Sequence, residues 1–577
     1  MRNDRIDFLK TAAILAVFFY HAGTLPNGYL GVEIFFVVSG YLMMRHIQKE
    51  MNADNFSPVR FLFGKVAGFM PTMVLVFSVS LAAACVFMLP DNLENFAESV
   101  VASSFFAENI LECLTTQNYW NPVNTYKPLM HLWYLGILMQ AFALLSILLY
   151  VVWRVAHKRK NSNFFLWTLG CISCISLGLY LLSDARAAYK FYYLPFRLYE
   201  ITLGGMVAFI QPRRLGEKKA IAMRSVFTVL LVVLFFAEQQ IADTIAVILT
   251  VFCSCGYLCG AVWTEEKCTL SPIVTWLGRH SFPVYLWHQV VIAFLRYAVF
   301  PNVTFAFVML SVILTIGLSF ATIKFMEGLR SISKGKMLAV CIPSATLLCA
   351  ISLVIFLKAG VIHDIPELGI SKDNAYRGMH SSYCDRVYEW DRDFETEDKI
   401  HVLIVGDSFG RDFANILAES EYADMLEISY VFAQRDVFES RLDRVEAADM
   451  VLFTVHPLEE VMPWIRKNVA DEKLYVIGDK SFGNSMGIVY AKRCREDYFS
   501  QRITIDSELL ETNLRMSEEF GSRFIDMLSP LLEGETVPAF TEDGHFISQD
   551  GEHLTQYGAQ YYAHILDLNF LLVGSVA

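Results

Sequence analysis

Long apolar runs divide the first 357 residues of the chain into hydrophobic segments separated by short polar connections. Each run approaches the roughly 20 residues that an α-helix needs to cross a bilayer. The pattern therefore predicts a multi-pass α-helical membrane domain of ten or eleven spans. The eleven candidate spans cover residues 6–22, 29–44, 69–89, 132–153, 164–182, 195–210, 224–237, 241–262, 281–300, 303–325 and 337–357.

The pattern changes after residue 358. Residues 359–397 are polar and predict a linker or an extended collar. Three short apolar runs follow, at 401–408, 449–457 and 473–480, with helical patterns between them. Buried strands that alternate with helices favour a three-layer α/β sandwich with a parallel sheet. We therefore expect a second domain over residues 398–577.

Composition and charge agree with this division. Hydrophobic residues make up 55% of the 577 residues, which is too many for one soluble globule. Residues 1–360 carry 28 Lys and Arg against 18 Asp and Glu, whereas residues 361–577 carry 19 against 41. The acidic second half would repel a phosphate backbone, so we expect no nucleic-acid partner.

The charges of the connections predict an orientation. Counted with the residues at the edges of the spans, the even-numbered connections hold nineteen Lys and Arg and the odd-numbered ones about five. By the positive-inside rule the N-terminus is cytoplasmic, and an odd number of spans places the C-terminal domain outside the cytoplasm.

Ten of the twelve cysteines lie in the membrane half, mostly within apolar runs, and no spacing indicates a metal site. Cys384 and Cys494 belong to the second half. An extracytoplasmic location permits a disulfide between them, and two free thiols are the alternative.

Two local patterns in the second half suggest nucleophilic catalysis. Ser408 follows an apolar strand and precedes a helix, where amide groups favour developing negative charge. Asp550 and His553 are three residues apart, so the carboxylate can orient an imidazole that takes the serine proton. The plainer alternatives are a helix cap at Ser408 and a surface histidine at His553.

The early Gly-Asp-Ser at 406–408 and the late Asp-x-x-His at 550–553 together resemble the SGNH hydrolase family, whose fold is a three-layer α/β sandwich. The resemblance implies that Ser408, Asp550 and His553 are catalytic. The family's glycine and asparagine oxyanion donors are not clear in this sequence. Asn484 is the candidate donor, with an ordinary turn residue as its alternative.

The first two predicted spans place ionisable side chains inside or beside the membrane, where they are costly and usually functional. Lys10 and His21 are eleven residues apart, which puts them on one helix face about 16 Å apart. Glu33 is a candidate to orient His21. Arg197 and Glu200 are three apart on another span, and they either shape a substrate tunnel or form a structural ion pair.

Several segments of the membrane half look like successive motifs of the acyltransferase-3 family of membrane acyltransferases: RIDFLKTAAILAVFFYHAG, GYLGVEIFFVVSGYLM, KPLMHLWYLGILMQ, FYYLPFRLYEITLGGMVA, WLGRHSFPVYLWHQVVI and IKFMEGLR. The resemblance covers most of residues 1–335 and leaves 336–358 as an additional transmembrane helix. Its Arg-x10-His motif falls on Lys10 and His21, which implies that His21 is the base or acyl-relay residue; the alternative is an interfacial histidine without a catalytic task. Lysine keeps the cation but loses the planar guanidinium fork.

Two positions depart from the family pattern. Gly68 stands where a second basic residue is usual, and Leu138 stands where an acidic residue is usual. His131 and His288 are recognition marks of the family motifs, and we interpret both as packed interfacial residues.

An acyltransferase-3 domain fused to an SGNH domain resembles bacterial enzymes that O-acetylate surface glycans. The resemblance implies a cytoplasmic acyl-CoA donor, usually acetyl-CoA. We predict no metal, although the residues by themselves do not indicate whether one is required. The acceptor stays open among peptidoglycan, O-antigen, capsule and exopolysaccharide, as do acyl chain length and oligomeric state. The alternatives are a membrane-anchored carbohydrate esterase or deacetylase, and a transporter or flippase with a non-catalytic outer domain.

Overall fold

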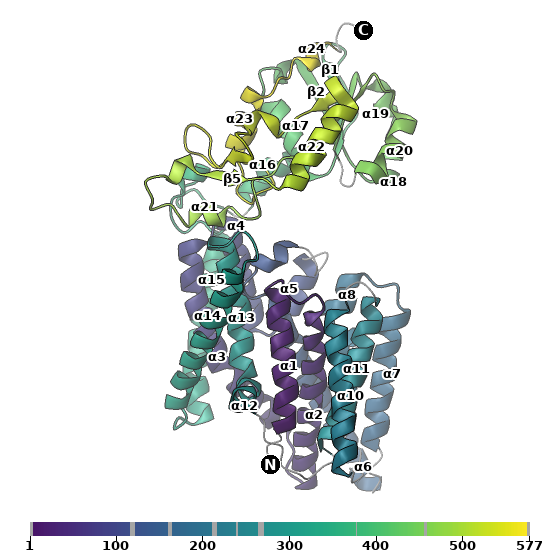
Figure 1. Ribbon diagram of the computed structural model, residues 1–577, viewed down its shortest axis with the longest axis vertical. Coiled ribbons are helices and arrows are strands. Elements are labelled where there is room, and N and C mark those ends of the chain that lie inside the picture. The colour runs from purple at the N-terminus through teal and green to yellow at the C-terminus, as the bar shows by residue number, and fades with distance from the viewer. Residues whose placement is uncertain are drawn as a thin grey trace. The chain divides into compact units, whose positions relative to one another are not determined.

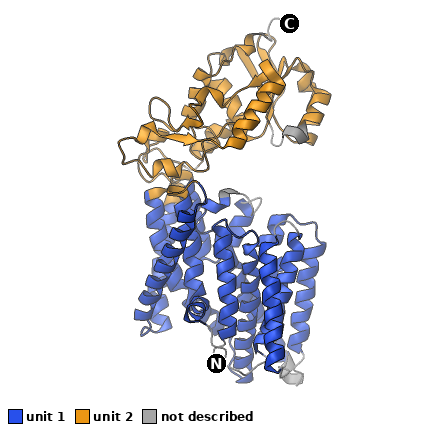
Figure 2. Cartoon of the chain, viewed as in Figure 1, with its two compact units in different colours: residues 1–86, 92–296, 302–354 blue, residues 87–91, 297–301, 355–577 orange. Residues whose placement is uncertain are grey.

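The chain forms two compact units (Figure 1, Figure 2). The computed structural model describes residues 4–115, 122–159, 164–209, 216–237, 241–262, 271–376, 378–454 and 458–573. Unit 1 comprises residues 1–86, 92–296 and 302–354, and unit 2 comprises residues 87–91, 297–301 and 355–577.

Unit 1 is a bundle of long helices, coloured purple to teal in Figure 1. The helices before residue 358 are α1 (Asp4–His21), α2 (Gly31–Asn52), α3 (Pro58–Phe87), α4 (Pro90–Ser104), α5 (Glu108–Thr115), α6 (Trp133–Arg159), α7 (Phe164–Leu182), α8 (Ala187–Tyr192), α9 (Leu194–Phe209), α10 (Glu217–Phe236), α11 (Asp243–Val262), α12 (Pro272–Arg279), α13 (Ser281–Ala298), α14 (Phe305–Gly328) and α15 (Lys334–Leu357).

All eleven predicted spans lie on helices of this set. Among the described residues, eight segments are long and apolar enough to cross a membrane, and they lie on α2, α3, α6, α7, α10, α11, α14 and α15. The other three predicted spans lie on α1, α9 and α13. These findings fit the predicted multi-pass membrane domain.

Burial separates central helices from peripheral ones. In the apolar window of α2, 72% of the residues are buried, against 17% in α7 and 22% in α10. Large apolar side chains such as Trp167 and Leu182 are exposed on α7. A helix that is apolar on its exposed face requires an apolar environment, so lipid is the expected solvent of the peripheral helices.

Glycines let the central helices α2 and α9 approach closely. A Cβ at Gly40 would lie 1.9 Å from the Ile201 carbonyl oxygen, and one at Gly204 would lie 2.1 Å from that of Val37. Small residues allow such backbone contact between membrane helices. The contact brings the polar residues of α2 and α9 together.

Unit 2 contains a five-stranded parallel sheet with the strand order β2-β1-β3-β4-β6 and a separate antiparallel pair, β5 with β7. The strands are β1 (Ile400–Gly406), β2 (Leu426–Phe432), β3 (Met450–Thr454), β4 (Leu474–Ile477), β5 (Arg502–Thr504), β6 (Phe524–Ile525) and β7 (Thr536–Pro538). The helices are α16 (Met379–Asp385), α17 (Ser408–Glu419), α18 (Arg435–Glu439), α19 (Leu442–Ala447), α20 (Leu458–Asn468), α21 (Gly487–Tyr490), α22 (Ser507–Phe520), α23 (Gln556–Ile565) and α24 (Phe570–Val573).

Both faces of the parallel sheet are buried. Val402 and Ile404 of β1 belong to one hydrophobic core with α17 and α23, while Leu403 and Val405 belong to the other core with α19, α20 and α22. Successive strand residues point to opposite faces, so a continuous apolar run fits a sheet covered on both sides. The α/β prediction is confirmed, and β2 and β6 are strands that the apolar runs did not identify.

Candidate active sites

Ser408 lies at the carboxyl end of β1, where the chain enters α17. Gly406 permits this turn because an added Cβ would lie 2.8 Å from the Gly410 Cα and 2.9 Å from the Thr454 Oγ1. The Asp407 carboxylate caps α17 by accepting the Phe409 N–H at 2.9 Å. Because β1 lies between β2 and β3, Ser408 occupies the switch point at which parallel sheets usually bind ligands.

Asp550 and His553 lie in the loop before α23, and the fold brings them to Ser408. His553 Nε2 is 2.8 Å from Ser408 Oγ, and His553 Nδ1 is 2.7 Å from Asp550 Oδ2. Asp550 Oδ1 also accepts the backbone N–H groups of Glu552 and His553, each at 2.8 Å. These bonds fix the carboxylate beside the imidazole that it orients.

The protonation states suit nucleophilic catalysis. Burial alone would raise the pKa of Asp550, but hydrogen bonds and charge from His553 and the two backbone N–H groups hold it well below its usual range. Burial alone would lower the pKa of His553, but the Asp550 carboxylate raises it above 6.5. Asp550 is therefore ionised, His553 Nδ1 donates to it, and Nε2 can accept the Ser408 proton.

The predicted oxyanion donor Asn484 is less well placed. It is exposed, and its loop contacts the Asp550 loop through the Phe482 N–H, which donates to the Gly551 carbonyl at 2.8 Å. Within the part of the chain that the structure describes, the Asn484 amide makes no hydrogen bond to Ser408, His553 or Asp550. Residues 455–457, which follow β3, lie outside the described residues.

Two residues beside the triad were not predicted from sequence. Asp412, one turn after Ser408 on α17, forms a buried ion pair with Lys480. The available signals were weak: an acidic residue four positions after the serine, and a lysine three residues after the end of β4.

A second polar cluster lies in unit 1. His21 ends α1, and its Nδ1 is 2.9 Å from Nε2 of His288 on α13. His288 Nδ1 lies 2.5 Å from the Tyr285 carbonyl oxygen, which can only accept. When both rings are neutral, His288 Nδ1–H donates to Tyr285, His21 Nδ1–H donates to His288, and His21 Nε2 keeps its lone pair. His288 therefore contacts the candidate base directly.

The ring of His131 completes this histidine cluster. It lies 5.1 Å from the ring of His288, nearly perpendicular to it. His131 belongs to a short 3-10 helix, η3 (Met130–Leu132), and its backbone carbonyl accepts the Tyr285 hydroxyl. Three histidines from separate segments thus meet at one place in unit 1.

Glu33 does not take the position expected of it beside His21. Its carboxylate accepts from Arg197 at 3.1 Å, and Arg197 also donates to Glu200 at 2.9 Å. All three side chains are at most 2% exposed. The guanidinium also lies over the rings of Phe191 and Trp133. Arg197 thus joins α2 to α9 through an ion pair with two carboxylates.

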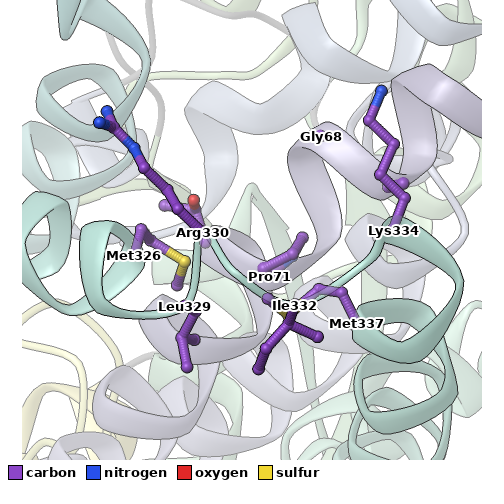
Figure 3. A pocket seen from close by; sticks show the side chains of 10 residues that line it. Gly68, Pro71, Met326, Leu329, Arg330, Ile332, Lys334 and Met337 are labelled. Carbon is purple, nitrogen blue, oxygen red and sulfur yellow. The ribbon is translucent and has the colours of Figure 1, made fainter.

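Lys10 lies three turns before His21 on α1, 4.0 Å from Asp7. A cavity of about 240 Å³ lies elsewhere in unit 1, between α3, the end of α14 and the start of α15. Gly68, one of the two positions that depart from the family pattern, lines it together with Arg330 and Lys334. Figure 3 shows the charged ends of Arg330 and Lys334 directed away from Leu329 and Ile332.

The cysteines of unit 2 are free thiols, with Cys384 buried and Cys494 exposed. Within the described ranges, no group of three or more His, Cys, Asp or Glu side chains could hold a metal ion.

Comparison with known proteins places the helical part in a family. A model of the acyltransferase domain, the acyltransferase-3 family, matches residues 3–324. The "Putative O-acetyltransferase SACOL0978" of Staphylococcus aureus strain COL is 25% identical over 312 residues, which are 50% of this chain and 51% of the relative. The O-acetyltransferase OatA of S. aureus strain NCTC 8325 / PS 47 is 26% identical over 315 residues, with the same shares.

The chain spans about half the length of the curated relatives it matches. No solved structure gives a significant match. The family model nevertheless covers more than half of the chain and includes His21, Glu33, Arg197 and His288. The resemblance seen in the sequence motifs is confirmed, and the chain belongs to the acyltransferase-3 family.

Proposed function

We propose that this protein is a membrane O-acyltransferase that moves an acyl group from cytoplasmic acyl-CoA onto hydroxyls of a cell-surface polysaccharide. Acetyl is the favoured acyl group, since the relatives are named as O-acetyltransferases. The membrane is a bacterial plasma membrane, with the N-terminus in the cytoplasm and unit 2 outside. The observation that carries the proposal is the Ser408–His553–Asp550 arrangement in the same chain as an acyltransferase-3 domain.

In unit 2, Ser408 is the nucleophile. His553 Nε2 takes the Ser408 proton while Oγ attacks the acyl carbonyl, and His553 then donates that proton to the leaving group of the acyl donor. A glycan hydroxyl next attacks the acyl-serine and gives its proton to His553. The serine–acyl bond breaks, Ser408 regains the proton and the ester leaves on the glycan. Asp550 stabilises the imidazolium in both steps.

In unit 1, His21 is the base or relay for the first transfer. The lone pair on Nε2, which follows from the hydrogen bonds of His288 with His21 and Tyr285, supports this role. Lys10 supplies a cation for a phosphate or carbonyl oxygen of the donor. The Arg197 cluster with Glu33 and Glu200 holds α2 and α9 together beside the donor path.

The proposal is tested with inverted membrane vesicles and radiolabelled acetyl-CoA, following label on protein and on glycan. We expect His21→Ala to abolish both, because no acyl group enters. Ser408→Ala should leave label in the membrane unit and lose only the glycan product. His288→Phe should reduce total labelling, because it removes the acceptor that fixes the tautomer of His21.

Exposed residues of the same types provide matched controls, namely Ser440→Ala and His564→Ala. Both variants should label as the wild type does. If Ser408→Ala leaves glycan labelling intact, the acyl-serine step is wrong and a transporter with a non-catalytic outer domain is favoured. Release of free acetate from acetylated glycan without CoA dependence would favour the esterase instead.

A further inference from the structure

A buried ion pair lies next to the Ser408 triad in unit 2. Asp412 Oδ2 is 2.8 Å from Lys480 Nζ, and the two side chains are 1% and 2% exposed. Removing two charges from water costs several kcal/mol per ion, so such a pair is not explained by stability alone. The mechanism proposed above uses neither residue.

The contacts of Asp412 connect the nucleophile to the catalytic histidine. Asp412 is four residues after Ser408 on α17, which places both on one helix face. Its Oδ2 also accepts the backbone N–H of Leu554 at 3.0 Å, and Leu554 directly follows His553. One carboxylate therefore joins the helix that carries the nucleophile to the loop that carries the base.

Lys480 connects a third segment to the same point. Its Nζ lies 4.0 Å from the ring centroid of Phe409, the residue after Ser408. Lys480 belongs to the loop after β4 that reaches the Asp550 loop through the bond from Phe482 to Gly551. Three segments that are distant in sequence thus converge on the Asp412–Lys480 pair.

We propose that Asp412 is a positioning residue that holds His553 in register with Ser408, and that Lys480 balances the charge of Asp412. This inference rests on the proposed acyl-serine step. It assigns both residues a part in the reaction without contact with the substrate, because both side chains are buried.

The charges near His553 allow the inference to be tested through the pKa of this residue. The groups that act on it are Asp550, Asp412 and Lys480: the two carboxylates raise the pKa of His553 and the ammonium lowers it. Arg411 Nη2 lies 4.0 Å from Asp412 Oδ1. The buried groups Cys384, Tyr430 and Tyr562 also lie near enough to interact with Asp412.

The experiment measures how fast a fluorophosphonate labels Ser408 in the full-length protein in detergent, as a function of pH. Ser408 Oγ forms a bond to phosphorus, fluoride leaves, and the serine proton passes to His553 and then to water. The rate depends on neutral His553, so it rises with pH through the pKa of that residue. Mass spectrometry identifies the labelled serine.

Substitutions of Asp412 and of Lys480 should shift the pH dependence of the labelling rate in opposite directions. Asp412→Asn keeps an acceptor for Leu554 but removes the negative charge, so the rising limb should move to lower pH. Lys480→Met removes the positive charge and should move the limb to higher pH, whereas Lys480→Arg should leave it in place. Each shift should be roughly one pH unit or less. The Asp412→Asn/Lys480→Met double variant should return near the wild-type profile.

Asp412→Ala tests positioning separately from charge. It removes the acceptor for Leu554 as well, and we expect the plateau rate at high pH to fall roughly 10- to 100-fold below that of Asp412→Asn. Equal plateaus in the two variants would overturn the positioning role. If Asp412 variants do not fold, the comparison of Lys480→Met with Lys480→Arg still decides the role of the pair.

The outcomes separate this inference from the proposed function. If wild-type Ser408 is not labelled at any pH, the acyl-serine step is overturned and the positioning role with it. If the wild type is labelled but Lys480→Met and Lys480→Arg share its pH profile, only the role of the ion pair is overturned.

Discussion

At the scale of single residues, the two candidate bases of this protein differ in what orients them. His553 donates to a carboxylate at 2.7 Å, whereas His21 donates to a neutral imidazole at 2.9 Å. A carboxylate stabilises the imidazolium that forms when the base takes a proton, and a neutral imidazole does so less. His553 is therefore better suited than His21 to a step that leaves a proton on the imidazole ring.

Asp550→Asn tests the orientation of His553. The amide oxygen can accept from His553 Nδ1–H, but the amide carries no negative charge and so does not stabilise the imidazolium. We expect fluorophosphonate labelling of Ser408 at neutral pH to fall by about 10⁴-fold, the scale of such a change in a serine–histidine–aspartate triad. The neighbouring exposed Glu552→Gln is the control and should label as the wild type does. A loss of only a few-fold would show that Asp550 is dispensable.

At the scale of elements, the ends of short helices place the catalytic groups. Asp407 caps α17 immediately before Ser408, and Thr555 caps α23 two residues after His553. Each cap satisfies N–H groups that have no partner inside the helix. The positions of Ser408 and His553 therefore depend on local hydrogen bonds as well as on the core beneath them.

Thr555→Ala tests the cap of α23. Thr555 Oγ1 accepts the Gly558 N–H at 3.0 Å and donates to the buried Phe546 carbonyl at 2.6 Å. Losing the cap and leaving a buried carbonyl unpaired should destabilise this region by about 2–3 kcal/mol. Hydrogen exchange of α23 amides in the full-length protein measures the change.

The matched control for this cap is Asp506→Ala. Asp506 caps α22 through the Glu508 N–H at 3.0 Å, but it is exposed. Its loss should cost only about 1 kcal/mol in the exchange of α22 amides. Equal losses in the two helices would contradict the added cost of the buried carbonyl.

At the scale of the whole molecule, a basic membrane half is joined to a strongly acidic second half. Positive charge in the connections on one side predicts which side is cytoplasmic, because Lys and Arg in short loops resist transfer across the membrane. The proposed reaction requires unit 1 to take the acyl group from a cytoplasmic donor and unit 2 to lie outside the cytoplasm. The location of unit 2 is therefore the first large-scale property to measure.

Cys494 reports this location. It is exposed in unit 2, whereas Cys384 is 2% exposed. If unit 2 lies outside, a membrane-impermeant maleimide should label Cys494 in intact cells, and Cys494→Ser should abolish that label. Labelling of Cys494 only after the cells are permeabilised would place unit 2 in the cytoplasm and contradict the predicted orientation.

Much of the architecture was readable from sequence because it depends on local patterns. A bilayer demands long apolar helices, so the spans are visible as apolar runs. A sheet covered on both faces leaves short apolar strands, so β1, β3 and β4 were predicted. Ser408 is marked by the strand before it, and Asp550 with His553 form a motif within four residues. Each of these signals lies within one element or one turn.

The pairing of distant residues was decided only by the tertiary structure. His21 and His288 are 267 positions apart, and Arg197 and Glu33 are 164 apart. Asp412 meets Lys480 because β1 and β4 belong to one sheet, with β3 between them. The chemistry of a side chain is known from the sequence, but its partner is not, because the partner depends on how helices and strands pack. The sequence determined the kinds of groups present, and the packing determined which of them act together.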